Sequence, residues 1–295
     1  MTCLIFTIII ILILICLVIS AFDMNRFVIR DYDVSFRQCK KDLRVVHISD
    51  LHNKSYGVLN SKLKKSIEGL QPDMIRMSGD IMTADRNKRS EENADDLVMY
   101  LAAKYPVYFS IGNHEERLKD KPEVYGDMYY ERIRRYKDSG VHVLDNESED
   151  IPEYGIRVTG LDIGRKYYSK THKEKLICSD ITDMAGNKDD DHLNLLLAHN
   201  PIYFKAYTEW GADLVLSGHI HGGIVRIPGI GGMLSPDVSF FPKYDGGIFK
   251  ENGSVMIVSR GLGTHTIPIR VFDPGELVCI DVHQWREKHG YTCQT

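Results

Sequence analysis

The stretch LRVVHISDLH (Leu43–His52) decides the fold of this chain. It begins with a short apolar run rich in β-branched side chains, which is typical of a buried strand. Two residues of metal-ligand type, Asp50 and His52, follow where the strand ends. Side chains two residues apart share a face of an extended chain, so both can reach one ion. The stretch therefore predicts a buried strand with a polar site at its carboxyl end.

Four further strand-like runs end in the same kinds of residue. The runs are Asp73–Gly79, Pro106–Gly112, Leu193–His199 and Asp213–His219. The residues that end or follow them are, in chain order, Asp80, Asn113 with His114, His199, and His219 with His221. Each motif alone is weak, because a single strand-end histidine is more often a hydrogen-bonded core residue. The joint pattern is not expected from random placement, so it predicts a metal site. Carboxylates and imidazoles without a thiolate suit manganese, iron or zinc.

Helical patterns separate several of these strands. Helices are expected over Gly57–Gly69, Ser90–Lys104 and Asp127–Ser139. Further strands are expected over Ile29–Phe36, Ile156–Leu161, Val255–Gly261 and Glu276–Val282. The succession of strands and helices predicts an α/β architecture with ligands at the carboxyl ends of the strands. The acidic stretch Asp180–Asp191 is expected to be a solvated surface loop.

The N-terminal run Leu4–Phe22 has the composition of a membrane segment. It carries no charge, and its length is close to the roughly 20 residues that a helix needs to cross a bilayer. No basic residue precedes it, so an uncleaved anchor is favoured over a cleaved signal peptide, which stays as the alternative. Basic residues follow it, and the positive-inside rule then places the rest of the chain in the cytoplasm.

Composition limits the classes of partner. The chain has 295 residues, of which 43% are hydrophobic and 26% charged, so it can bury an ordinary core. Its net charge of −4 gives no strong field toward nucleic acid, and no nucleic-acid partner is expected. The six cysteines are scattered without a CxxC pair, which indicates neither a disulfide framework nor a zinc ribbon.

The order and loop context of the motifs resemble the calcineurin-like metallophosphoesterase family. The motifs are Asp50-x-His52, Gly79-Asp80, Gly112-Asn113-His114-Glu115, His199 and Gly218-His219-x-His221. Later features resemble the membrane-associated bacterial branch similar to UDP-2,3-diacylglucosamine pyrophosphohydrolase. These features are Asn200-Pro201, Tyr244-Asp245-Gly246-Gly247, Ser259–Gly263 and Pro268-Ile269-Arg270.

The resemblance implies a four-layer α/β/β/α sandwich and two divalent metal ions (manganese, iron or zinc). For the ligands it implies Asp50, His52 and His221 at one ion and Asn113, His199 and His219 at the other, with Asp80 bridging them. His114 is implied not to bind metal but to protonate the leaving oxygen or stabilise the transition state. A hydroxide bridging the two ions would attack phosphorus in line.

The implied function is hydrolysis of a phosphoester, most consistent with a phosphodiesterase or pyrophosphatase near a membrane. A lipid- or nucleotide-sugar-linked ester is one option for the substrate. A phosphomonoesterase or protein phosphatase on the same site stays open, whereas a non-catalytic scaffold has no reason to keep every motif. Arg260 and Arg270 are candidates for contacting the substrate phosphate.

The chain is expected to have three parts. Residues 1–25 form the N-terminal transmembrane anchor, and residues 26–42 form a juxtamembrane segment with the leading strand. Residues 43–295 form the metallophosphoesterase domain. This division implies a single-pass membrane protein, and the charge rule places its catalytic domain on the cytoplasmic side.

Overall fold

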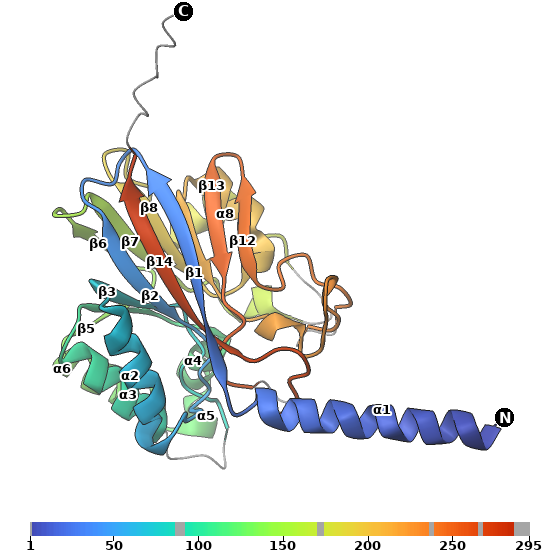
Figure 1. Ribbon diagram of the computed structural model, residues 1–295. Coiled ribbons are helices and arrows are strands. Elements are labelled where there is room, and N and C mark those ends of the chain that lie inside the picture. Colours follow the sequence, from blue (N-terminus) through green and yellow to red (C-terminus); the bar gives the residue numbers. More distant parts are fainter. Residues whose placement is uncertain (1, 86–91, 170–173, 236–238, 265–267, 286–295) are drawn as a thin grey trace, which may run out of the picture.

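Two six-stranded sheets are stacked face to face in the computed structural model, which describes residues 2–85, 92–169, 174–235, 239–264 and 268–285 (Figure 1). Across the first sheet the strands are β1 (Phe27–Phe36), β14 (Gly275–Gln284), β2 (Leu43–Ile48), β3 (Met74–Met77), β4 (Val107–Ser110) and β5 (Val141–Leu144). Across the second they are β12 (Gly247–Glu251), β13 (Ser254–Val258), β9 (Leu214–Ser217), β8 (Leu193–Ala198), β7 (Ile156–Leu161) and β6 (Ser148–Ile151). The central strands β2 to β5 and β7 to β9 run parallel, so their carboxyl ends meet along common edges.

Helices cover the outer faces of both sheets. Those packed on the first sheet are α2 (Ser61–Leu70), α3 (Glu92–Ala102), α4 (Asn113–Asp120), α5 (Pro122–Tyr125) and α6 (Met128–Asp138). Those on the second sheet are α7 (Cys178–Ala185) and α8 (Phe204–Trp210). Short 3-10 turns are η1 (Val58–Asn60), η2 (Arg165–Tyr168), η3 (Pro201–Tyr203) and η4 (His221–Gly223), and a two-stranded ribbon joins β10 (Arg226–Ile227) to β11 (Gly231–Gly232).

Adjacent residues of one strand face different cores, which establishes the layers. On β2, Val45 packs between the two sheets, whereas Val46 packs against the helices outside the first sheet. On β8, Leu195 lies between the sheets and Leu196 contacts the helices outside the second. Both strands are therefore buried on two faces, as strands covered by another layer on each side must be. The α/β/β/α sandwich predicted from the sequence is confirmed.

Two expectations about local structure are wrong. The helix predicted from Gly57 begins only at Ser61, because Leu59 and Asn60 adopt positive φ angles of 45° and 59° that interrupt it. The acidic stretch from Asp180 is not all loop, since α7 extends to Ala185. Ile181 of this helix is fully buried, and the Asp180 carboxylate accepts a hydrogen bond from the N–H group of Ile177, which precedes the helix. The helix was not predicted because most of the side chains in this stretch are polar or acidic and only one face of the helix is buried.

The helix α1 (Thr2–Asp23) projects from the body at one end of the sandwich (Figure 1). Its apolar side chains are exposed along most of its length, whereas Ser20 and Asp23 at its carboxyl end are buried. It is long and apolar enough to cross a membrane, a test that a membrane anchor and a signal sequence both pass. After α1, β1 pairs in parallel with β14 along its whole length.

We predict that full-length protein stays in the membrane pellet after alkaline carbonate extraction. The reason is that the apolar side chains of α1 are exposed along most of its length, and a span of this length partitions into hydrocarbon. A variant chain that starts at Asn25 is the control and should be released. Equal release of both chains, with the N-terminus of the longer one intact, would contradict an anchor.

Candidate metal centre

The candidate ligands converge where the carboxyl ends of the two sheets meet. Asp50 follows β2, Asp80 follows β3, and Asn113 begins α4 just after β4. His199 comes directly after β8, and His219 closely follows β9. Stacking the two sheets brings loops that are distant in sequence to one place, as expected for ligand sites in α/β proteins.

At this place, three groups of side chains have ligand atoms within 4.8 Å of one another. The groups are Asp50, His52 and His221; His52, Asp80 and His114; and Asp80, His199 and His219. The first and third correspond to the two ligand sets expected from the sequence, apart from Asn113. Asp80 and His52 connect the groups, so the arrangement suits a pair of ions better than two separate sites.

The first group has the spacing of atoms around a common cation. The His221 Nε2 atom lies 3.2 Å from the Asp50 Oδ1 atom and 3.2 Å from the His52 Nε2 atom. Ligand atoms that are each about 2.0–2.2 Å from one ion are themselves about 3 Å apart. The Asp50 Oδ2 atom is held by the Ser49 hydroxyl at 2.6 Å, which fixes the rotation of the carboxylate.

Around Asp80, three buried atoms of ligand type make no hydrogen bond: Asp80 Oδ2, His199 Nε2 and Asn113 Oδ1. The His199 Nε2 atom lies 3.2 Å from Asp80 Oδ2. The other ring nitrogen of His199, Nδ1, donates to the Ser78 carbonyl at 2.8 Å, which leaves Nε2 as the nitrogen that faces Asp80. Burial acts to lower the pKa of His199, but Asp80 and Asp50 raise it to about 10, so a metal bound at Nε2 would displace a proton. Leaving such atoms buried without a partner is costly, and a divalent cation is the group that would satisfy all three. The residues therefore fit a metal.

The backbone at the site is strained in a consistent way. Five of the candidate ligands adopt positive φ angles between 47° and 71°: Asp50, His52, Asp80, His219 and His221. This left-handed region is sparsely populated by residues other than glycine. Such strain persists only where surrounding structure enforces it, and it concentrates at functional sites. The strained turns aim successive side chains at one point.

Glycines allow the ligand loops to approach one another closely. A Cβ atom on Gly112 would lie 2.4 Å from the Asp80 Oδ1 atom, and one on Gly79 would lie 2.4 Å from the Gly112 nitrogen. A Cβ atom on Gly218 would lie 2.0 Å from the Ser49 hydroxyl oxygen. A side chain at Gly79 or Gly112 would separate neighbouring loops of the first sheet, and one at Gly218 would push the loops of the two sheets apart.

Glu115, which was assigned no role from the sequence, supports the site. Its two carboxylate oxygens are buried and accept hydrogen bonds from the backbone N–H groups of Asp80 (2.8 Å), Met82 (2.8 Å) and Gly112 (3.0 Å). Burial, with a contribution from Asp80, raises the pKa of Glu115 to about 7. Its position just after Asn113 and His114, in the first turn of α4, was the available signal.

His114 lies beside the first group of ligands. Its ring makes an edge contact with the His52 ring, with centroids 4.7 Å apart. The Ala84 N–H group donates to the His114 Nδ1 atom at 3.0 Å, so in the neutral ring the proton is on Nε2. Burial lowers the pKa of His114, and Asp80 opposes this shift. The Nε2 atom is thus the one that can exchange a proton or contact a ligand.

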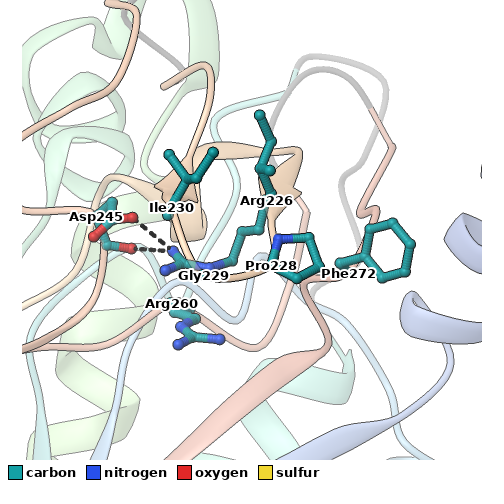
Figure 2. A pocket seen from close by; sticks show the side chains of 9 residues that line it. Arg226, Pro228, Gly229, Ile230, Asp245, Arg260 and Phe272 are labelled. Atoms are coloured by element: carbon teal, nitrogen blue, oxygen red, sulfur yellow. Dashed lines mark hydrogen bonds and ion pairs between the residues drawn. The ribbon is translucent and has the colours of Figure 1, made fainter.

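The two arginines proposed for the substrate are placed differently. Arg270 is only 2% exposed, and its guanidinium donates to the carbonyl groups of Arg260, Gly261 and Gly263 and to Asp273. It holds the loop that packs on Asp50 and cannot also present its guanidinium to a substrate, so that expectation is corrected. The Arg260 Nε atom lies 3.3 Å from the Glu276 Oε2 atom, and the residue lines a cavity of about 440 Å³ (Figure 2).

Comparison with known proteins agrees with this geometry. The family model of the calcineurin-like phosphoesterases matches residues 43–223, and the chain belongs to that family. The family depends on two metal ions, and the protein is a metal-dependent phosphoester hydrolase. It is 26% identical over 254 residues to YpbG of Bacillus subtilis, covering 84% of this chain and 83% of that protein.

Two relatives have more informative names. The metallophosphoesterase YkoQ of Bacillus subtilis is 25% identical over 235 residues, covering 79% of this chain and 80% of that one. The UDP-2,3-diacylglucosamine pyrophosphatase LpxG of Chlamydia muridarum is 23% identical over 282 residues, covering 81% of this chain and 82% of that one.

We predict that Glu115→Gln lowers the free energy of unfolding by about 2–3 kcal/mol, because an amide N–H₂ group then faces at least one buried backbone N–H group. Denaturant unfolding of the purified protein measures the change. Glu123→Gln is the matched control, since Glu123 is exposed, and it should change stability by less than about 0.5 kcal/mol. Equal effects of the two substitutions would contradict a supporting role for Glu115.

A second prediction concerns Asp80. The isosteric Asp80→Asn removes the charge shared by the two groups, so dialysed protein should lose both ions. Asn113→Ala should lose only one, because Asn113 is assigned to a single ion. Elemental analysis gives the stoichiometry of each variant. Retention of one ion by Asp80→Asn, with the same occupancy as Asn113→Ala, would show that Asp80 is not shared.

Proposed function

We propose that the protein hydrolyses a phosphodiester or pyrophosphate bond at this centre, with two divalent ions bound by the seven assigned ligands. The ligands are Asp50, His52 and His221 at one ion, Asn113, His199 and His219 at the other, and Asp80 between them. The observation that carries the proposal is the set of buried ligand atoms around Asp80 Oδ2 that lack hydrogen bonds. Manganese, iron and zinc all suit this set of nitrogen and oxygen donors.

When bound, the two ions would supply a nucleophilic water and screen the negative charge of the phosphoryl group. The protein's own contribution is to hold its ligands without further movement. Asp50 is fixed by Ser49, and His199 by the Ser78 carbonyl. Preorganised groups of this kind need no rearrangement as charge develops in the transition state.

His114 is assigned the role of general acid, which protonates the leaving oxygen. Its Nδ1 atom accepts the Ala84 N–H group, which leaves the proton on Nε2. Its backbone N–H group donates to Asp80 Oδ1 at 2.8 Å, which ties the position of the ring to the carboxylate at the centre of the site. A neutral imidazole with one proton can give it to a departing alkoxide.

The diesterase or pyrophosphatase assignment is supported by the similarity to LpxG, whose name describes a pyrophosphatase acting on a diacylated sugar nucleotide. A lipid- or nucleotide-sugar-linked ester is therefore the proposed substrate class. With α1 as a single-pass anchor, the enzyme would meet such esters at the membrane, and the basic residues after α1 favour the cytoplasmic side. The division into anchor (1–25), leading segment (26–42) and catalytic domain (43–295) belongs to the same proposal.

A phosphomonoesterase is the second candidate, because the same ligands serve both reactions. We predict that with added Mn²⁺ the protein turns over bis-p-nitrophenyl phosphate with a higher kcat/KM than p-nitrophenyl phosphate. Omitting metal after chelation should abolish both activities. A clear preference for the monoester would select the second candidate.

We predict that His114→Ala keeps both ions but slows an alkyl phosphodiester by about 10²–10⁴-fold, the usual effect of losing a general acid. The loss should be much smaller with a nitrophenyl leaving group, which needs no proton. His219→Ala is the comparison, because a lost ligand should empty a site and slow both esters. Loss of metal from His114→Ala, or equal slowing of both esters, would remove the general-acid assignment.

A further inference from the structure

We propose that the body of the protein docks on the bilayer through a rim of apolar side chains beside α1, in addition to the anchor itself. We define this apolar rim by its exposed members: Ile230, Phe240, Phe241, Ile269 and Phe272. Their exposed fractions are 70%, 70%, 57%, 36% and 48%. They belong to the segments between β10 and β12 and before β14, on the side of the body from which α1 projects (Figure 1).

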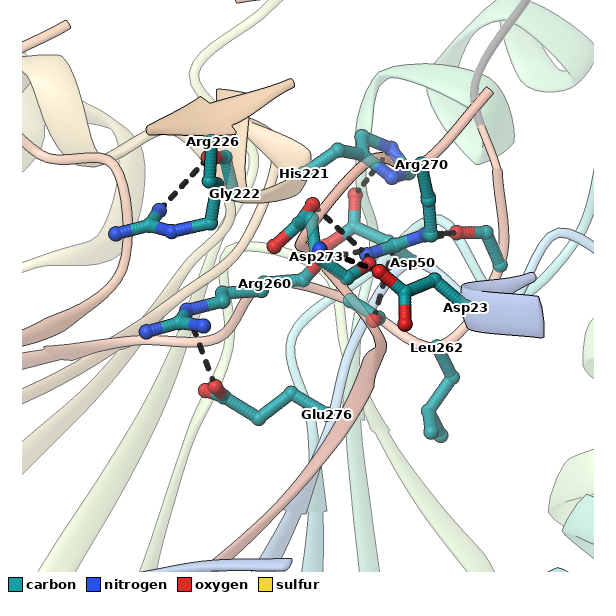
Figure 3. Close-up of polar contacts among 12 residues, drawn as sticks. Asp23, Asp50, His221, Gly222, Arg226, Arg260, Leu262, Arg270, Asp273 and Glu276 are labelled. Atoms are coloured by element: carbon teal, nitrogen blue, oxygen red, sulfur yellow. Dashed lines mark hydrogen bonds and ion pairs between the residues drawn. The ribbon is translucent and has the colours of Figure 1, made fainter. Parts of the chain in front are cut away.

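The direction of α1 relative to the body is fixed by hydrogen bonds. The backbone N–H group of Arg270 donates to the Ser20 hydroxyl at 3.1 Å, and that of Asp273 donates to the Asp23 carboxylate at 2.9 Å (Figure 3). Ser20 and Asp23 are 3% and 2% exposed, so these bonds lie away from water. Buried polar pairs of this kind must be kept satisfied. The carboxyl end of α1 is thus part of the folded body and not a loose tether.

A fixed helix sets the depth of the residues that touch it. Phe272 and Pro274 border an apolar groove of about 510 Å³ together with Val18, Ile19 and Phe22 of α1. Val18 precedes the first charged residue, Asp23, by about 7 Å along the helix axis, at 1.5 Å per residue. Phe272 therefore lies beside the apolar run of α1. With α1 spanning the bilayer, it would reach the level where acyl chains begin.

Polar and apolar groups alternate across this face as they do in proteins bound at a membrane interface. Ile230 and Phe272 border the same cavity as Arg226 and Arg260 (Figure 2). Arg226 is bound to Asp245 at 3.0 Å and to the Gly222 carbonyl at 2.7 Å, so it stays in place beneath the rim. Gly222 directly follows His221, and docking would hold the metal centre close to the headgroup layer.

Bilayer lipid is the occupant that this geometry favours for both the rim and the groove. The apolar surface of α1 continues directly onto Phe272 and Pro274 through the shared groove. A second copy of the chain could also cover the exposed phenylalanines of the rim. Lipid is favoured over it because α1, as an anchor, turns the rim toward the bilayer. The inference depends on α1 being an anchor and goes beyond the proposed reaction.

The test places a fluorescent side chain on the rim of full-length protein in vesicles of phosphatidylcholine and phosphatidylglycerol. Phe272→Trp and Ile230→Trp report on the rim. Tyr130→Trp is the matched control, because Tyr130 is also exposed but belongs to α6 on the side away from α1 (Figure 1). All three carry Trp285→Phe to remove the exposed native tryptophan. Lipids brominated on the acyl chains should quench both rim variants about twofold relative to unbrominated lipids, as expected for side chains inserted to the acyl boundary, and leave the control unchanged.

Unquenched rim variants in protein that resists carbonate extraction would overturn the proposal. If chemical cross-linking of the same vesicles captures dimers, a second copy covers the rim instead of lipid, and the proposal is overturned. Release of the protein by carbonate would also overturn it, because the rim would then have no bilayer to meet. Hydrolysis of bis-p-nitrophenyl phosphate in the same samples is measured in parallel. Retained turnover with unquenched rim variants separates failure of the docking proposal from failure of the proposed function.

Discussion

One buried carboxylate, Asp80, sets the requirement that the rest of the structure meets. Its Oδ1 atom accepts the His114 N–H group, while its Oδ2 atom makes no hydrogen bond and faces His199 Nε2 at 3.2 Å. A charged group that is 1% exposed is costly unless a counter-charge lies next to it. Burial lowers the pKa of His52, His114 and His219, whereas Asp80 and Asp50 raise that of His199 against the effect of burial. Without metal the His199 imidazolium is therefore the counter-charge, and a bound divalent cation would take its place. The buried charge of Asp80 therefore favours the binding of a cation at this place.

The sandwich meets this requirement because the carboxyl ends of its two sheets bring candidate metal ligands together around Asp80. Asp80 and Asn113 come from the first sheet, whereas His199 and His219 come from the second. The loops of the two sheets approach closely only because Gly218, which follows β9, leaves room beside Ser49 and Asp50, which follow β2. Hydrogen bonds around Arg270 and Asp273 connect the segment that packs on Asp50 to Asp23 of α1. The carboxyl end of α1 and the candidate metal centre therefore share one hydrogen-bonded network.

Much of this could be predicted from the sequence, because strand-end ligands are local signals. The strands before Asp50, Asp80 and His199 are short apolar runs, and the ligands follow them directly. What could not be predicted depends on contacts between distant segments. Nothing in the sequence around Arg270 indicates that its guanidinium would donate hydrogen bonds to three backbone carbonyl groups. Glu115 likewise becomes important only when the Asp80 loop folds over α4, and α7 stayed hidden because only one of its faces is buried.

The most direct test of this account is electron paramagnetic resonance of the protein loaded with two equivalents of Mn²⁺. Two ions that share the Asp80 carboxylate should be magnetically coupled, so the spectrum should be that of an exchange-coupled pair. In Asp80→Asn that spectrum should disappear. A simple six-line signal of isolated ions in the unaltered protein, at full occupancy of two, would contradict the shared carboxylate and with it the central claim.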